Sequence, residues 1–205
     1  MLIFKKNIKP LYFVHIPRTG GRYLRELFIK NKFTVNFHNH NEYYYGKEIP
    51  HLNFPYYLKF SNYGSIPQFT VVRHPITRFI SLLSSSIKKD NTNINIEEIL
   101  NNKNLFFNFI NKQILETNFN TNWFLPQVYF INSNCKIWKY ENGFEKPFFK
   151  WLKKEFNINL KNKKIPLNSR IKLHYDFSKK IKLNKQTIKY IKEFYKHDYK
   201  LLDYK

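Results

Sequence analysis

The chain has 205 residues, of which 19% are aromatic, so its length suits one domain, residues 1–205, with a substantial core. Lysine and arginine total 36 against 14 acidic residues, and the formal net charge of +22 favours anionic partners over cationic ones. The single cysteine, Cys135, excludes a disulfide within the chain, and no apolar run is long enough to span a bilayer, so we expect a cytoplasmic protein without a membrane span.

The first predicted strand covers residues 11–14, a short apolar run typical of a central parallel strand. Pro17 ends it, and Thr-Gly-Gly at 19–21 allows a tight turn, because glycine adopts positive φ without steric cost. Apolar residues over 23–28 then recur at helical spacing. A helix N-terminus attracts anions, and Arg18 and Arg22 add charge, so the segment predicts a phosphate-binding turn. It lacks Walker A spacing, and an ordinary turn with surface arginines is the alternative.

A second strand is predicted over 33–37, and it is followed by residues 41–67, which are rich in Tyr, Pro, Asn and His and lack periodicity. We expect this irregular segment to lie on the substrate side, because functional loops often sit on a rigid scaffold.

The next strand-loop-helix unit begins with an apolar strand over 69–72, which Arg73-His74-Pro75 ends. A helix follows from about residue 76, and Pro75 suits its first turn. Arg73 at the strand end and Ser81 two turns into the helix are residue types that can converge on one phosphate. The alternative is that Arg73 pairs with a carboxylate and that Ser81 is an ordinary small helix residue.

The rest of the chain predicts helices over 96–100, 105–115, 144–156 and 185–195, a strand over 136–140, and a loop over 168–182 that closes over a ligand. Strands alternating with helices predict an α/β fold with an open parallel sheet flanked by helices. Ligands bind at the carboxyl ends of such strands, where both loops are expected.

Together, the two loops resemble those of the sulfotransferases that use 3′-phosphoadenosine 5′-phosphosulfate (PAPS), in particular the carbohydrate and heparan-sulfate-type enzymes and their bacterial and viral relatives. The family's first loop reads roughly Pro-Lys-Thr-Gly-Gly/Ser-Thr, and its second reads Arg-Asp-Pro-x-x-Arg-Phe-x-Ser. The matching positions here are Pro17, Thr19, Gly20, Gly21, Arg73, Pro75, Arg78, Phe79 and Ser81. Weaker likenesses at 126–127, 136–142, 168–169 and 195–199 extend the resemblance over most of the chain.

The resemblance implies a three-layer P-loop-like scaffold with PAPS as sulfuryl donor and no metal. It implies that the first loop and the residue after it bind the 5′-phosphosulfate through Arg18, Thr19, Gly20, Gly21, Arg22 and Tyr23. It implies that Arg73 and Ser81 bind the 3′-phosphate, with Asn168 and Ser169 as further contacts. Two residues depart from the pattern, because Arg18 replaces the loop lysine and Arg22 replaces a threonine. Arginine keeps the charge that stabilises a leaving phosphate, but it does not donate its proton at ordinary pH.

Sulfuryl transfer to an alcohol needs a base, and histidine suits that task. His51 occupies the interval where the resembling family often has its base, and it is our first choice. His38 and His40, after the second strand, come next. His15 at a strand end and His74, which replaces an acidic residue, are expected to be structural.

The sequence therefore predicts a PAPS-dependent sulfotransferase with His51 and Arg18 as catalytic residues. Its acceptor is expected to be a carbohydrate hydroxyl, with an acidic carbohydrate as one option. A catalytically degenerate module that binds nucleotide or polyanion and a phosphotransferase remain alternatives. A nucleic-acid-binding protein has the charge in its favour but no recognised reading element. Because Lys, Asn, Ile, Phe and Tyr have A/T-rich codons, biased codon usage can supply the basic composition without any partner.

Overall fold

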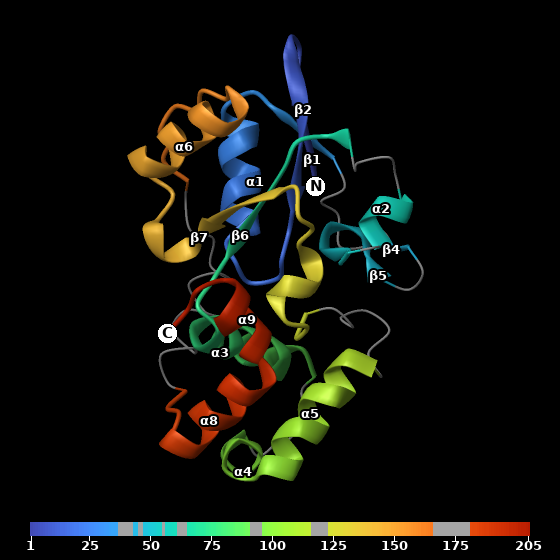
Figure 1. Cartoon of the computed structure of the whole chain (residues 1–205), viewed down its shortest axis with the longest axis vertical. Coiled ribbons are helices and arrows are strands. Elements are labelled where there is room, and N and C mark those ends of the chain that lie inside the picture. The colour runs from blue at the N-terminus through green and yellow to red at the C-terminus, as the bar shows by residue number, and fades with distance from the viewer. Residues whose placement is uncertain are drawn as a thin grey trace. The chain divides into compact units, whose positions relative to one another are not determined.

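The computed structural model describes residues 1–36, 43–44, 47–54, 56–60, 65–90, 96–115, 123–165 and 181–205 (Figure 1). The chain divides into two compact units, which are treated separately here. The first comprises Met1–Arg73 and Tyr129–Ile165, and the second comprises His74–Val128 and Pro166–Lys205. The single domain expected from the chain length stays a prediction.

The first unit is built on a five-stranded mixed sheet with the order β3-β1-β2-β6-β7. Its strands are β1 (Leu2–Lys5), β2 (Ile8–Val14), β3 (Thr34–Asn36), β6 (Gln68–Val72) and β7 (Cys135–Lys139). β2, β6 and β7 run parallel, as expected, whereas β1 is antiparallel to both β2 and β3. The all-parallel prediction is therefore wrong at β1. Only two residues join β1 to β2, and a parallel connection needs about a dozen.

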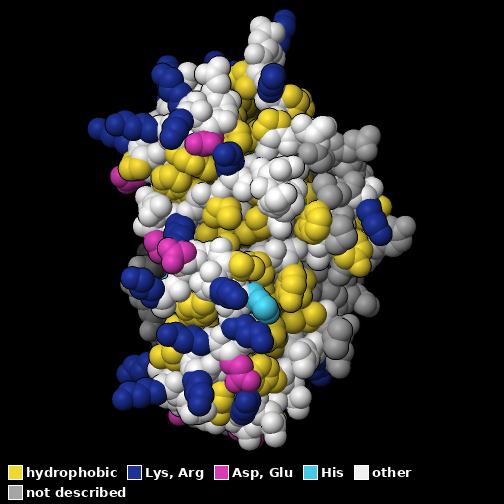
Figure 2. All heavy atoms as spheres, viewed as in Figure 1, with side chains coloured by type: hydrophobic (Ala, Val, Ile, Leu, Met, Phe, Trp, Pro, Cys, Tyr) yellow, Lys and Arg dark blue, Asp and Glu magenta, His cyan; other side chains and the backbone are white. Residues whose placement is uncertain are grey.

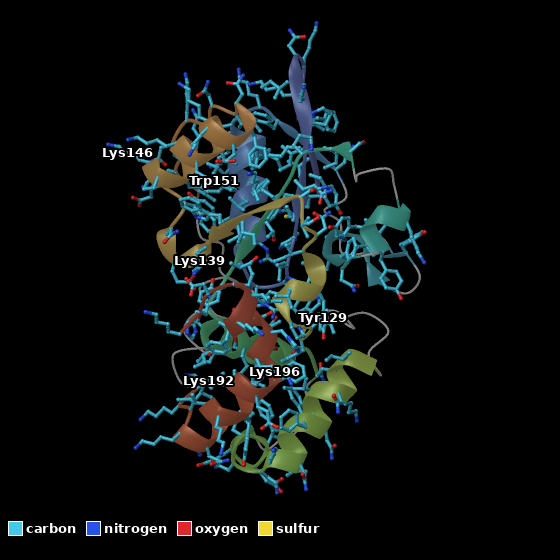
Figure 3. The ribbon with its side chains drawn as sticks, in the orientation of Figure 1. Tyr129, Lys139, Lys146, Trp151, Lys192 and Lys196 are labelled. Carbon is cyan, nitrogen blue, oxygen red and sulfur yellow. The ribbon has the colours of Figure 1, made fainter. Side chains whose placement is uncertain are left out.

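Two helices supply most of the apolar side chains that cover this sheet. α1 (Gly21–Lys30) and α6 (Lys146–Phe156) share one buried cluster with the strands. The cluster includes Leu24, Leu27 and Phe28 of α1, Phe148 and Leu152 of α6, and Phe13, Phe69, Val71 and Trp138 of the strands. Figure 3 labels Trp151, on α6, whose ring lies 5.3 Å from that of Trp138. The helices predicted after residues 21 and 144 are thus confirmed. α1, which directly follows the loop 15–20, packs on the sheet through this cluster.

Shorter elements complete the first unit. β4 (Tyr43–Tyr44) and β5 (Lys47–Glu48) form a separate antiparallel pair. η1 (Ile49–His51) follows β5, and α2 (Tyr56–Phe60) comes after η1. η4 (Tyr140–Asn142) follows β7, and η3 (Gln127–Phe130) spans the boundary between the two units along the chain. The segment predicted to be irregular, 41–67, thus contains several short elements among its described residues.

The second unit is helical where the structure describes it. It contains α3 (Pro75–Asp90), α4 (Ile96–Asn101), α5 (Lys103–Leu115), α8 (Lys185–Phe194) and α9 (Lys196–Leu201). Its core is a second buried cluster, formed by Phe79, Leu82, Leu83, Phe106, Ile110, Ile191 and Tyr195 among others. The four helices predicted here are confirmed, and α9 is additional. Across the described ranges, no helix has the combined length and apolar character that a membrane crossing requires.

Candidate functional site

The carboxyl ends of three parallel strands lie at one edge of the sheet in the first unit. β6 pairs with β2 on one side and with β7 on the other, in the registers Val14↔Thr70 and Val72↔Lys139. The residues that follow these strands are the loop 15–20, Arg73 and the turn beginning at Tyr140. This edge is where ligands bind in open α/β sheets, so the loop and Arg73 lie where the sequence places them.

The loop after β2 is closed by its own backbone and by Thr19. Arg18 and Gly20 have φ of 68° and 97°, so two residues adopt the left-handed region. The buried Thr19 hydroxyl donates to the carbonyl of Ile16 at 2.8 Å. The amide of Leu24 donates to the Gly20 carbonyl at 3.1 Å and starts α1. The Thr19 side chain thus shapes the loop, and α1 begins immediately after it with its N-terminus at this edge.

His15 packs directly against the first residue of α1. A Cβ added to Gly21 would lie 1.9 Å from Nε2 of His15, so the imidazole occupies the place of a side chain there. The His15 ring is 4.3 Å from the ring of His51, centroid to centroid, and Nδ1 of His51 lies 3.1 Å from the His15 carbonyl oxygen. Both histidines are buried. The second glycine of the loop, Gly21, is thus required by packing against His15.

Arginine side chains gather beside this loop. Nη1 of Arg73 lies 3.4 Å from the carbonyl oxygen of Arg18, and the Arg73 guanidinium lies 4.7 Å from the centre of the Tyr140 ring. Burial, together with the charges of Arg22 and Arg73, lowers the pKa of Arg18 to about 10, while Tyr140 acts in the opposite direction. All three arginines therefore interact electrostatically, and an anion placed among them would relieve their mutual repulsion. We call Arg18, Arg22 and Arg73 the arginine cluster.

The segment after β7 contributes two aromatic residues, Tyr140 and Phe144, that sequence reasoning did not assign to the site. A Cβ on Gly20 would lie 2.9 Å from the Phe144 ring and 3.3 Å from the Tyr140 ring. Phe144 also stacks on Tyr23, with ring centres 5.3 Å apart. The predicted Tyr23 thus lies half-buried next to these rings. A tyrosine as the last residue of the predicted strand 136–140 was the signal that could have identified Tyr140.

The predicted histidines fall in different environments. His51 is 3% exposed and lies beside His15 in the first unit. His38 and His40 lie outside the described residues. His74 belongs to the second unit, where its ring packs edge-on against Tyr199 and its Nε2 lies 3.2 Å from the backbone carbonyl of Lys205.

Arg78, the second arginine of the resembling motif, is a structural residue of the second unit. It is fully buried, and its guanidinium donates to the carbonyls of Trp123 at 2.7 Å and Leu125 at 3.0 Å. The buried carboxylate of Asp198 accepts from the backbone and side-chain amides of Gln127, at 3.0 and 3.2 Å. These contacts fix the segment before η3 against the C-terminal helices.

Of the remaining predicted site residues, the structure describes only the local setting of Ser81. Ser81 lies on α3 in the second unit, half-buried, and its carbonyl accepts from the Ser84 hydroxyl at 3.0 Å. Its role beside Arg73 stays a prediction. Asn168 and Ser169 lie outside the described residues.

The face drawn in Figure 2 carries Lys and Arg side chains distributed widely, with few acidic side chains among them. Comparison with protein-family models gives no match, and neither the curated proteins nor the solved structures give a significant one. A functional assignment of the chain therefore depends on the two loops that follow β2 and β6 and on the arginine cluster.

Proposed function

We propose that this chain is a PAPS-dependent sulfotransferase with a P-loop-like scaffold, which moves a sulfuryl group to a hydroxyl of a carbohydrate. The observation that carries the proposal is the arginine cluster at the carboxyl ends of β2 and β6, beside the N-terminus of α1. Guanidinium groups are suited to phosphate and sulfate oxygens, because their fork of N–H donors matches those anions. A helix N-terminus adds backbone donors and a positive dipole.

The proposed roles follow the position of each residue. The loop backbone from Thr19 to Gly21, together with Arg18 and Arg22, binds the 5′-phosphosulfate. Arg73 binds the 3′-phosphate. In the reaction, the acceptor oxygen attacks sulfur in line with the bridging oxygen, which leaves on the phosphate of the product nucleotide. Arg18 stabilises the negative charge that develops on that leaving oxygen. Most of the rate enhancement then comes from positioning and charge stabilisation, as in phosphoryl transfer.

His51 is the proposed base. With Nδ1–H donating to the His15 carbonyl, 3.1 Å away, Nε2 carries the lone pair that accepts the hydroxyl proton of the acceptor. The contact with His15 also ties His51 to the loop that binds the nucleotide. Replacing His51 with glutamine should lower kcat and remove the acidic limb of its pH profile, while leaving nucleotide affinity nearly unchanged. A His51→Gln enzyme with an unaltered pH profile would contradict this role.

Binding without transfer is a second candidate, and Arg18 is the observation that favours it. With a pKa of about 10, Arg18 is protonated at neutral pH and supplies charge without donating a proton. A chain that only binds would be stabilised by adenosine 3′,5′-bisphosphate and would transfer no label from PAPS to any glycan.

The first experiment is a thermal-shift titration with adenosine 3′,5′-bisphosphate, with ATP and 5′-AMP as controls. A selective site should add about 2.7 kcal/mol of stability at a ligand concentration of 100 times Kd. Arg73→Ala should remove most of this effect. Arg25→Ala is a matched control, because Arg25 also lies on α1, its guanidinium bonds Glu26 at 2.7 Å, and it is not among the charges that act on Arg18. A wild-type response to the bisphosphate no larger than that to ATP would contradict the family assignment.

A further inference from the structure

A group of exposed lysines surrounds the C-terminal end of α1, at the end of the helix remote from the arginine cluster. We call Lys5, Lys30, Lys32, Lys161, Lys163 and Lys164 the lysine cluster. They come from the end of β1, the end of α1 and the segment after α6, which are far apart in the sequence. All belong to the first unit.

Asn31, the C-cap residue of α1, bonds two of these lysines, Lys5 and Lys161. Its side-chain amide donates to the Lys161 carbonyl at 3.2 Å, and its side-chain oxygen accepts from the Lys161 amide at 2.7 Å. Its own backbone carbonyl accepts from Nζ of Lys5 at 3.4 Å. In addition, Nζ of Lys30 donates to the Lys164 carbonyl at 2.8 Å. The segment 161–164 is thus bonded to the C-terminal end of α1.

The positive charge of the lysine cluster is not offset by ion pairs. Lys5 and Lys30 donate to carbonyl groups, which carry no net charge, so their own charge remains. Within the ranges that the structure describes, none of the six lysines forms an ion pair with a carboxylate. Glu26 of α1 bonds Arg25, and Glu155 of α6 bonds Lys136. Six like charges held together attract a partner with several negative charges.

The spacing of the two basic groups favours a polymer as that partner. α1 has 10 residues, so its ends lie about 15 Å apart at 1.5 Å per residue. A small anion engages one end only, whereas a linear polyanion bound at the lysine cluster can extend toward the other end of the helix, where the proposed nucleotide site lies.

Among polyanions, the residue types favour an acidic polysaccharide over a nucleic acid. Single-stranded nucleic acids are bound on exposed aromatic side chains that stack on bases. The aromatic ring beneath Lys5 is Phe33, which is 5% exposed and therefore presents no stacking face. Lysines act as point charges toward sulfate and carboxylate groups and require no such face. We infer that the lysine cluster anchors an acidic polysaccharide, and the choice of a polysaccharide rests on the proposed function.

The test compares two triple variants with the same change in charge. One is Lys161→Glu, Lys163→Glu and Lys164→Glu in the lysine cluster. The control is Lys185→Glu, Lys189→Glu and Lys196→Glu, exposed positions on α8 and α9 of the second unit; Figure 3 labels Lys196. The probes are a heparin octasaccharide and a single-stranded DNA 12-mer, and affinities are measured from 0.05 to 0.3 M salt. Glutamine versions of both triples replace any variant that does not fold.

We expect the lysine-cluster variant to lose about tenfold or more in heparin affinity at 0.15 M salt. The dependence of its affinity on salt should also be weaker, because binding through fewer lysines releases fewer counterions. The control variant should lose less than about threefold. Equal losses in both variants would overturn the inference, because binding would then follow net charge alone. Equal or tighter DNA binding with the same dependence on the cluster would overturn the assignment to polysaccharide.

The nucleotide response separates this inference from the proposed function. The lysine-cluster variant should keep the wild-type thermal shift with adenosine 3′,5′-bisphosphate, because the arginine cluster is unchanged. If wild type shows no such shift, the proposed function fails while the heparin result still decides whether the lysine cluster binds polysaccharide.

Discussion

Replacing Gly21 with alanine tests the packing of His15 on the phosphate-binding loop. In a helix this exchange normally stabilises by about 0.5–1 kcal/mol, because alanine loses less backbone entropy. Here the new Cβ would lie 1.9 Å from Nε2 and 2.1 Å from Cδ2 of His15. The ring has little room to move, since it stacks on Phe13 with ring centres 5.4 Å apart and contacts the tilted ring of His51 at 4.3 Å.

Overpacking a buried site costs about 1–3 kcal/mol. After the gain in helix propensity is subtracted, Gly21→Ala should lower the free energy of unfolding by about 1–2 kcal/mol. Urea denaturation followed by circular dichroism measures this change. His15→Ala removes the ring, so Gly21→Ala in that background should recover most of the loss. A double-mutant cycle should therefore give a coupling energy above about 1 kcal/mol.

The sign of the change in the free energy of unfolding tests whether His15 packs on Gly21. A Gly21→Ala protein as stable as wild type, or more stable, would show that helix propensity outweighs the contact and that His15 does not pack there. Strictly additive effects of the two substitutions would refute the contact as well, because independent sites do not couple.

Three further predictions concern buried groups. Arg78→Met should cost about 3 kcal/mol or more, since it removes the donor to two partly buried carbonyls and leaves Asp198 without a nearby cation. Arg25→Met, at a partly exposed position, should change the urea midpoint less. Burial raises the pKa of the Asp198 carboxyl above its usual 3.8, so the folded protein binds this proton more tightly than the unfolded chain. The contribution of Asp198 to stability should therefore fall as pH rises above about 4. Asp198→Asn should lack this part of the pH dependence, and parallel urea midpoints of the two proteins from pH 3 to 7 would contradict the direction. Burial raises the pKa of the Cys135 thiol from 9.0 to about 12. Iodoacetamide at pH 8 should therefore label the native thiol roughly a thousandfold more slowly than the thiol of the denatured chain, and comparable labelling rates would exclude the buried position.

Local sequence patterns predicted most elements correctly, because each is encoded within a few neighbouring residues. The apolar runs before residues 15 and 73 are strands, and the periodic segments after them are helices. β1 was not predicted, since a run of four apolar residues followed by two lysines has no distinctive period. Its antiparallel place between β2 and β3 depends on pairing with residues 11–12 and 34–36, which no local pattern reveals.

Motif positions did not reveal what each motif residue contacts. Arg78 and Arg73 occupy one short motif, yet Arg78 donates to backbone carbonyls in the second unit, while Arg73 lies over Tyr140 in the first. Thr19 similarly directs its hydroxyl to Ile16. Residue type and spacing cannot separate these roles, because each depends on partners distant in the chain.

The sequence by itself determined the two strand-loop-helix units, their glycines and their basic residues, since these follow from short-range propensity and turn chemistry. Only the tertiary structure decided that Arg18 interacts with Arg22 and Arg73, that Gly21 must leave room for His15, and that Asn31 bonds both Lys5 and Lys161. Each of these depends on side chains from separate strands and helices meeting in space. Such meetings are set by sheet order and by packing against the core, to which the whole chain contributes.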